Sequence, residues 1–467
     1  ASINPSQDLI AYKTMENEIR IVNLKNRSEV YSIQLFDDDF FFFSNPEGYY
    51  TYIGDANEQI KLRRGLDLYA LHQFDLHYNR PDLLIAGLPQ PDTAAQQQFT
   101  RLINTRQRRF GSVPNGLDNP KAAPEILQID FDQSVDTVVF AAQQRKIQIQ
   151  VTCRARPQSL ARLHLWLNDI PLHGRQGLQL PPNKDALITI PLDIALSEGL
   201  NRIELSASDY EGRQSAMKTF SLNFRPDQSM SPSLYFIGIG VARYDHLPDL
   251  VNVDRDVSSF KALLEENKNG LYRQVITHTF LNEEFRWESL TEIGRILENT
   301  REEDRVILFY SGHGGFDRDN EYMVFTQHTS LKQDTTSGIP YSELEALLDG
   351  IPARKKLLLL NACNSGEYDQ DMEAFRLMND LFVNLSRGSG TMIISSSASD
   401  QASYTGLPIF GKNSALGRAL IDYFQQEETI SIVPLSQHLE ATVRTLSRGK
   451  QIPELRNNYR IRDFRIW

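Results

Sequence analysis

Residues 306–315, Val-Ile-Leu-Phe-Tyr-Ser-Gly-His-Gly-Gly, join an apolar run to a polar, glycine-rich stretch. Residues 357–366, Leu-Leu-Leu-Leu-Asn-Ala-Cys-Asn-Ser-Gly, show a similar pattern of an apolar run followed by a polar stretch. Short, unbroken apolar runs are typical of strands that are buried on both faces. We therefore expect two buried strands that end at Tyr310 and Leu360, just before a histidine and a cysteine.

Further apolar runs surround these two, at 235–239, 275–280 and 392–394. Between them lie stretches with a helical period, namely Val257-Phe260-Leu263-Leu264 and Leu290-Ile293-Ile296-Leu297. Strands that alternate with helices indicate a mostly parallel sheet covered by helices on both faces. The pattern predicts an α/β domain over residues 231–467.

His313 and Cys363 carry the candidate chemistry of this domain. In open α/β sheets, sites form beyond the carboxyl ends of the strands, and the flanking glycines permit close backbone approach. A thiolate attacks a carbonyl carbon, and an imidazole delivers a proton to the leaving amine. Backbone N–H groups of Gly314 and Cys363 are expected to hold the oxyanion. Taken singly, each residue also fits an ordinary packing or hydrogen-bonding role, but together they indicate a catalytic pair.

The motifs Tyr-Ser-Gly-His-Gly and Asn-Ala-Cys-Asn-Ser-Gly resemble those of the caspase, metacaspase and paracaspase superfamily (clan CD, peptidase C14-type). Cys363 follows His313 by fifty residues, which is the spacing known for caspases. Other segments match the family in order: Asp254–Asp256, Ser395–Gln401, Asn413–Leu416 and Gln451–Pro453. The resemblance covers roughly residues 231–467 and implies a caspase-like cysteine endopeptidase with a Cys/His dyad.

The resemblance also implies the pocket that receives the P1 side chain, the S1 pocket. Metacaspases usually carry Asp two residues before the cysteine, where this chain has Asn361. Asp254 lies where the second S1 carboxylate is expected, Ser311 matches a further S1 position, and Asp400 is an extra acid near the rim. The arginines that select Asp substrates in caspases have no clear counterpart, because Leu250 stands near that place. Cleavage after Arg or Lys is therefore favoured, with Asp or another P1 residue as the alternative; Asp254 also fits a helix N-cap.

The N-terminal half lacks a catalytic cluster and is rich in strand patterns. Residues 1–88 are predicted to be a β segment, in which residues 18–24 alternate with period two. Part of it resembles the last blade of a WD40-type propeller, without the Trp-Asp pair. One blade cannot bury its faces alone, so further blades are expected upstream. A small irregular β subdomain is the alternative.

Residues 89–124 are predicted to be a helix over 93–110 and a linker at Gly111–Pro124. Residues 125–226 resemble an Ig-like β-sandwich, with strand patterns at 146–151, 164–167, 187–190 and 202–207. Cys153 falls within a strand pattern and fits a small buried hydrophobe. A second linker, Arg225–Ser233, precedes the α/β domain. The layout resembles bacterial WD40–caspase fusion proteins, in which upstream β modules would regulate the peptidase or bind a protein partner.

Composition narrows the class of partner. A net charge of −11 and a pI of about 5.4 argue against nucleic acid, because phosphate binding needs a basic surface. Residues 101–109 are basic, but they fit the solvated face of a helix. No apolar run reaches 18 residues, so no membrane span is expected. Two cysteines fit a reducing, and by resemblance bacterial, cytoplasm. The chain starts at Ala1 without Met or a signal-like segment, which suggests a piece of a longer protein.

No cofactor or metal is expected, since zinc-ligand spacing and a phosphate-binding loop are both missing from the sequence. Some metacaspases are activated by calcium through loop acids, and acids flank the two motifs here: Asp317, Asp319, Asp369 and Asp371. Their spacing fits no calcium loop, which favours solvated turns. Two rival functions stay open: a catalytically silent caspase-like signalling scaffold, and another hydrolase or acyltransferase with the same dyad. Roles in stress, defence or cell death are expected from the resemblance only.

Overall fold

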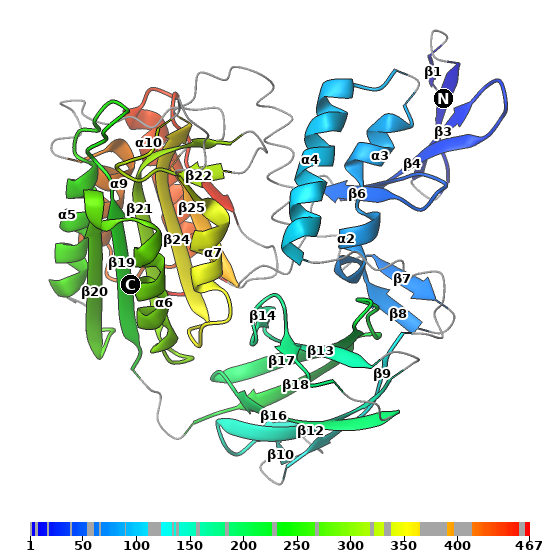
Figure 1. Cartoon of the computed structure of the whole chain (residues 1–467), viewed down its shortest axis with the longest axis horizontal. Helices are drawn as coiled ribbons and strands as arrows, with labels where there is room; N and C mark the ends of the chain where they lie inside the picture. The colour runs from blue at the N-terminus through cyan, green and yellow to red at the C-terminus, as the bar shows by residue number, and fades with distance from the viewer. Residues whose placement is uncertain are drawn as a thin grey trace.

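The computed structural model describes the chain (Figure 1) except residues 1, 5–7, 16–17, 38–39, 54–59, 65–66, 89, 111–122, 133–134, 137–139, 156–158, 183–185, 227–230, 267–269, 318–321, 331–337, 365–389, 397–412 and 457–462. Most of the linker predicted at Gly111–Pro124 lies outside the described residues. Among the described residues, no helix combines the length and the apolar character needed to cross a membrane.

The N-terminal part is a six-stranded antiparallel sheet in which consecutive strands are neighbours: β1 (Ser2–Asn4), β2 (Leu9–Lys13), β3 (Glu18–Asn23), β4 (Glu29–Asp37), β5 (Phe40–Ser44) and β6 (Tyr50–Ile53). A hairpin of β7 (Lys61–Arg64) and β8 (Asp67–Ala70) follows, then a 3-10 turn η1 (Leu71–Gln73) and the short helices α2 (Asp75–Tyr78) and α3 (Pro81–Ala86). The Tyr31 hydroxyl donates to the Leu84 carbonyl over 2.5 Å, which ties β4 to α3. The region is β-rich as expected, and its relation to a propeller stays a prediction.

Helix α4 (Thr93–Phe110) forms over the residues for which the apolar period predicts it. Phe99 and Ile103 are buried, at positions four residues apart on one helix face. This helix packs chiefly against α3 and so belongs to the N-terminal part.

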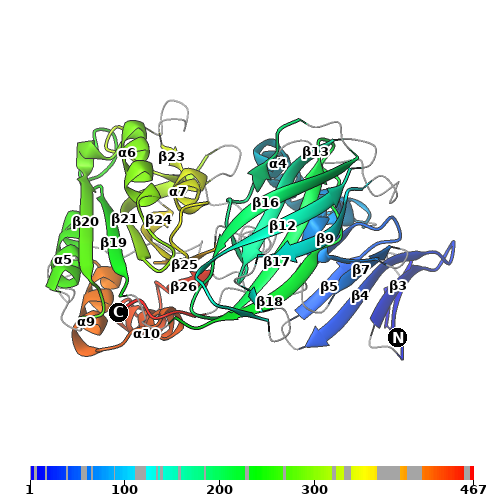
Figure 2. The same ribbon diagram turned by 90° about the horizontal axis from the view of Figure 1, so that it is seen from below.

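The next part is a β-sandwich. One sheet contains β9 (Glu125–Phe131), β12 (Lys146–Arg154) and β16 (Leu187–Ala195), and the other contains β10 (Val135–Asp136), β11 (Ala141–Ala142), β13 (Leu160–Leu167), β14 (Ile170–Pro171), β15 (Leu178–Gln179), β17 (Gly199–Asp209) and β18 (Lys218–Phe224). Alternate side chains of both sheets point inward and form one shared hydrophobic core. Cys153 lies in that core, fully buried as predicted, and burial raises the pKa of its thiol to about 12. Figure 2 shows this sandwich beside the C-terminal α/β domain.

The α/β domain is built on a mostly parallel sheet in the order β20 (Gln274–Leu281), β19 (Ser233–Gly240), β21 (Arg305–Phe316), β24 (Lys355–Asn364), β25 (Thr391–Ser395) and β26 (Glu454–Arg456). The first five strands are parallel, and β26 is antiparallel. Two short strands, β22 (Tyr322–Val324) and β23 (Ile339–Pro340), extend from the end of β21. The mostly parallel sheet expected for this region is confirmed.

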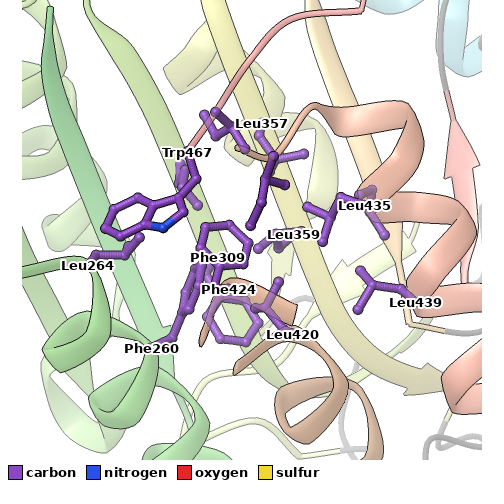
Figure 3. Close-up of a cluster of buried hydrophobic side chains, with 14 of the residues drawn as sticks. Phe260, Leu264, Phe309, Leu357, Leu359, Leu420, Phe424, Leu435, Leu439 and Trp467 are labelled. Carbon is purple, nitrogen blue, oxygen red and sulfur yellow. The ribbon is translucent and has the colours of Figure 1, made fainter. Parts of the chain in front are cut away.

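Helices cover both faces of this sheet because its central strands are apolar on both sides. One face packs against α5 (Val253–Glu266), α9 (Ala415–Gln426) and α10 (Ile432–Leu446), and the other against α6 (Trp287–Glu298) and α7 (Tyr341–Leu348). Figure 3 shows the first of these cores, where Phe260, Phe309 and Phe424 meet beside Trp467. The sheet is thereby a rigid support for whatever lies at its carboxyl edge.

Candidate functional site

The two motif-bearing strands are longer than their apolar runs predict. β21 continues to Phe316 and β24 to Asn364, so His313 and Cys363 lie inside strands rather than in the loops that follow. Beyond Tyr310, β22 pairs with β21 on one side while β24 pairs with it on the other, and these ladders supply hydrogen bonds that the apolar pattern does not reveal. The register pairs Ser311 with Asn361 and His313 with Cys363.

This register sets the two candidate catalytic residues side by side. Adjacent strands in a sheet lie about 4.8 Å apart, so the main chains of His313 and Cys363 are immediate neighbours. The backbone of Cys363 is described, whereas its side chain lies outside the described residues. The sequence prediction that the two motifs meet at one edge of the sheet therefore agrees with the fold.

The imidazole of His313 is 8% exposed and has one defined tautomer. Its Nε2 lies 2.9 Å from the carbonyl oxygen of Pro248, which can only accept, so Nε2 carries the proton. Among the described residues, its Nδ1 has no hydrogen-bond partner. Burial lowers the pKa of His313, and the contact with Pro248 opposes that effect. The ring is thus a neutral imidazole with a free nitrogen lone pair.

Glycines in the histidine motif make room for packed aromatic residues. A Cβ on Gly312 would lie 2.6 Å from the Tyr310 hydroxyl oxygen, and a Cβ on Gly314 would overlap the hydroxyl of Tyr322. The motif needs glycine at these positions because aromatic side chains close over the main chain on both sides of His313.

A buried polar cluster lies beneath the cysteine strand, centred on Asn361. Its Nδ2 is 2.9 Å from Ser311 Oγ, 3.0 Å from Ser414 Oγ and 3.2 Å from Asp256 Oδ2. Asn361 is 4% exposed, and its Oδ1 has no hydrogen-bond partner among the described residues. Two of the four predicted S1 residues, Ser311 and Asn361, are therefore in direct contact.

The carboxylate of this cluster is Asp256, a fully buried residue of α5 whose side chain meets the start of α9. Its Oδ1 accepts from Ser414 N over 2.9 Å and from Asn413 Nδ2 over 3.0 Å. Ser414 is the N-cap of α9 and accepts from Gly417 N, and a Cβ on Gly417 would overlap the Asp256 carboxylate. Burial raises the pKa of Asp256 to about 6, although its hydrogen bonds favour the ionised form.

Asp254, the carboxylate expected from the resemblance, has different surroundings. Its Oδ1 accepts from the neighbouring Arg255 N, and α5 begins at Val253, so Asp254 lies in the first helical turn rather than at the N-cap. The S1 role of Asp254 stays a prediction, and Asp400 lies outside the described residues. The helical period could have identified Asp256, because it is four residues before Phe260 on the buried face of α5.

Among the described residues, no group of three or more His, Cys, Asp or Glu side chains is placed to hold a metal ion. Of the four loop acids considered for calcium, three (Asp319, Asp369 and Asp371) lie outside the described residues, and Asp317 follows directly after β21.

The α/β sheet thus carries a histidine and a cysteine in register on neighbouring strands. Residues 237–465 match the family model described as "Caspase domain", of peptidase C14. The match supports a caspase-like domain of the peptidase C14 type over these residues, as the sequence motifs predict.

No curated protein matches the chain. Among solved structures, protein GSU0716 from Geobacter sulfurreducens matches with 17% identity, a TM-score of 0.35, and coverage of 48% of this chain and 92% of that chain.

Proposed function

We propose that the caspase domain is an active cysteine endopeptidase in which Cys363 is the nucleophile and His313 its general base and acid. The observation that carries the proposal is the His313–Cys363 register pair, together with an imidazole held at Nε2 whose Nδ1 is unpartnered among the described residues. A catalytic base needs a free lone pair close to the proton it removes.

The electrostatics of His313 suit both halves of such a reaction. Neutral His313 takes the thiol proton, and the thiolate attacks the peptide carbonyl. The resulting imidazolium is disfavoured by burial, so it readily returns the proton to the leaving amine. The backbone N–H groups of Gly314 and Cys363 would stabilise the oxyanion, and water would then hydrolyse the acyl-enzyme.

We further propose that the peptidase cleaves after Arg or Lys. Asp256 supplies a negative charge behind Asn361, and the free Oδ1 of Asn361 can accept from a cationic side chain. Asn361→Ala removes this acceptor and should lower kcat/KM for Arg substrates. Asp254→Asn tests the role predicted from the resemblance. Cleavage only after Asp would refute this specificity.

The decisive experiment digests a diverse peptide mixture with wild type and Cys363→Ala, with and without calcium, and identifies the cleavage sites by mass spectrometry. The endopeptidase proposal requires cleavage that is lost in Cys363→Ala. If every peptide stays intact, the proposal is wrong and the scaffold or another hydrolase becomes the better account.

Thiol labelling supplies a second, independent measurement. Cys153 is fully buried and burial raises its pKa to about 12, so it should resist iodoacetamide at neutral pH. An activated Cys363 should react much faster, and His313→Ala should slow that reaction. Equal and slow labelling of both cysteines would favour a silent scaffold.

Regulation of the peptidase by the β-sandwich is a further part of the proposal. Arg175 lies between β14 and β15, and its guanidinium forms an ion pair with the Glu345 carboxylate of α7 over 3.2 Å. The backbone N–H of Arg175 donates to Asp349 Oδ2 over 2.9 Å. Ile170 packs on Gly390, one residue before β25, the strand beside the cysteine strand. The sandwich is therefore well placed to influence the neighbourhood of Cys363.

A charge swap across this interface tests the coupling. Arg175→Glu and Glu345→Arg should each change the rate of Cys363-dependent cleavage, and the double variant should restore it, because it rebuilds the ion pair in reverse. Single variants with wild-type rates would show that this contact is structural only.

A further inference from the structure

The loop that follows β19, residues 241–252, is fixed by hydrogen bonds to Ser311 of the histidine strand β21 and to Asn282. Val241 N, one residue beyond the end of β19, donates to Ser311 O of β21 over 2.9 Å. Asn282 Oδ1 accepts from Ala242 N and Arg243 N, both at 3.0 Å. Asn282 has a φ of 52°, a left-handed conformation that asparagine tolerates better than most residues.

Tyr244 is the residue of this loop that reaches the main chain of His313. β19 ends at Gly240, so it offers no carbonyl to the His313 N–H two residues beyond the last register pair. The Tyr244 hydroxyl takes that place and accepts from His313 N over 2.7 Å. An unpaired buried N–H would otherwise carry the full penalty of desolvation.

The Tyr244 ring also contacts the catalytic candidate itself. Its centroid lies 4.6 Å from that of the His313 imidazole, with the planes inclined at 52°. The N–H of Tyr244 donates to Asp249 Oδ1 over 2.8 Å, which closes the loop around Pro248, whose carbonyl receives His313 Nε2. One short segment thus holds the backbone, the ring plane and the protonated nitrogen of His313.

We propose that Tyr244 is a positioning residue for His313: its hydroxyl replaces the missing strand partner and so fixes the main chain of His313 where Nε2 meets Pro248 and Nδ1 remains free for the cysteine. This inference rests on the proposed peptidase function for its effect on rate. Its effect on the tautomer of His313 does not depend on that function.

Tyr235 provides a matched control. It is a tyrosine of the same strand region, 9% exposed against 8% for Tyr244, and its hydroxyl donates to the Asn299 carbonyl over 3.2 Å. It lies near the amino end of β19, away from His313. Tyr235→Phe therefore removes one buried tyrosyl hydrogen bond from the same domain without touching the site.

The experiment compares the full chain as wild type, Tyr244→Phe and Tyr235→Phe. The tautomer of His313 is read by long-range nitrogen-15 NMR at pH 8 and assigned with His313→Gln, and kcat and KM are measured for Cys363-dependent cleavage. Tyr244→Phe should give a mixture of Nε2–H and Nδ1–H forms and lower kcat about tenfold to a hundredfold, with KM within about twofold. Tyr235→Phe should leave the tautomer and kcat unchanged.

A wild-type tautomer together with a wild-type kcat in Tyr244→Phe would overturn the inference, even if its thermal stability falls. If wild type shows no Cys363-dependent cleavage, the peptidase proposal fails, and the NMR comparison still decides the role of Tyr244. Should Tyr244→Phe not fold, Asp249→Ala loosens the same loop and should produce the same tautomer mixture; an unchanged tautomer there would also count against the inference.

Discussion

Replacing Asp256 by Asn tests the buried cluster beneath Asn361 most directly. Asp256 is fully buried, and burial raises its pKa from 3.8 to about 6. A raised folded-state pKa means that the folded chain binds a proton more tightly than the unfolded chain. This group therefore contributes stability that is fully present below about pH 4 and is lost as the pH rises through about 6.

The size of the effect follows from the two pKa values. The change from 3.8 to about 6 corresponds to about 3 kcal/mol in total. Between pH 4.5 and 7.5, linkage predicts that wild type loses about 2 kcal/mol through this group alone. Asp256→Asn removes the ionisation, so its unfolding free energy should fall less steeply by that amount. Asp254→Asn is the comparison variant, because Asp254 is two residues away and only partly buried and its replacement leaves Asp256 able to ionise. Since the charge of Asp254 helps to raise the pKa of Asp256, this variant should make the slope only slightly shallower.

The measurement is urea unfolding of the α/β domain across this pH range. The chain has three tryptophans, and Trp467 is 2% exposed in the core of this domain. In a background with Trp166→Phe and Trp287→Phe, its fluorescence reports this domain rather than the sandwich. The slopes are compared because the offset at one pH also contains altered hydrogen bonds. Parallel slopes for wild type and Asp256→Asn would refute the buried, raised-pKa carboxyl.

Other substitutions test neighbouring features of the domain. Gly312→Ala places a Cβ 2.6 Å from the Tyr310 hydroxyl and should cost about 1–3 kcal/mol of stability, together with most of the activity. Gly294→Ala is its control, because the new Cβ would meet nothing closer than 3.8 Å, and it should stabilise α6 by about 0.5–1 kcal/mol. Urea unfolding compares the stabilities of the two variants. Ser414→Ala removes the α9 N-cap and should cost about 1–2 kcal/mol in the same assay. Lys356 is fully buried, and burial lowers its pKa to about 7. Because the unfolded chain then binds the proton more tightly than the folded chain, the unfolding free energy of wild type should rise between pH 7 and pH 10, and that of Lys356→Met should not. Equal pH profiles of the two proteins would contradict this.

The strands and helices of the α/β domain could be predicted because each has a local cause. Unbroken apolar runs such as Val306–Tyr310 need cover on both faces, and a helical period such as that of Val257 and Phe260 marks the face that supplies it. The histidine and cysteine motifs likewise predict candidate catalytic residues, because each motif is a short run of adjacent residues. Strand ends were less predictable, because β21 extends past Tyr310 only where β22 and β24 come to pair with it.

What the sequence determined by itself was therefore the α/β class of residues 231–467 and the pairing of His313 with Cys363 as the candidate site. Only the tertiary structure decided which groups surround that pair. Pro248 and Tyr244 hold His313 from a loop more than sixty residues earlier, and Asp256 rather than Asp254 reaches Asn361. These choices depend on register, helix phase and burial between segments distant in the chain, and short sequence motifs do not encode such distances.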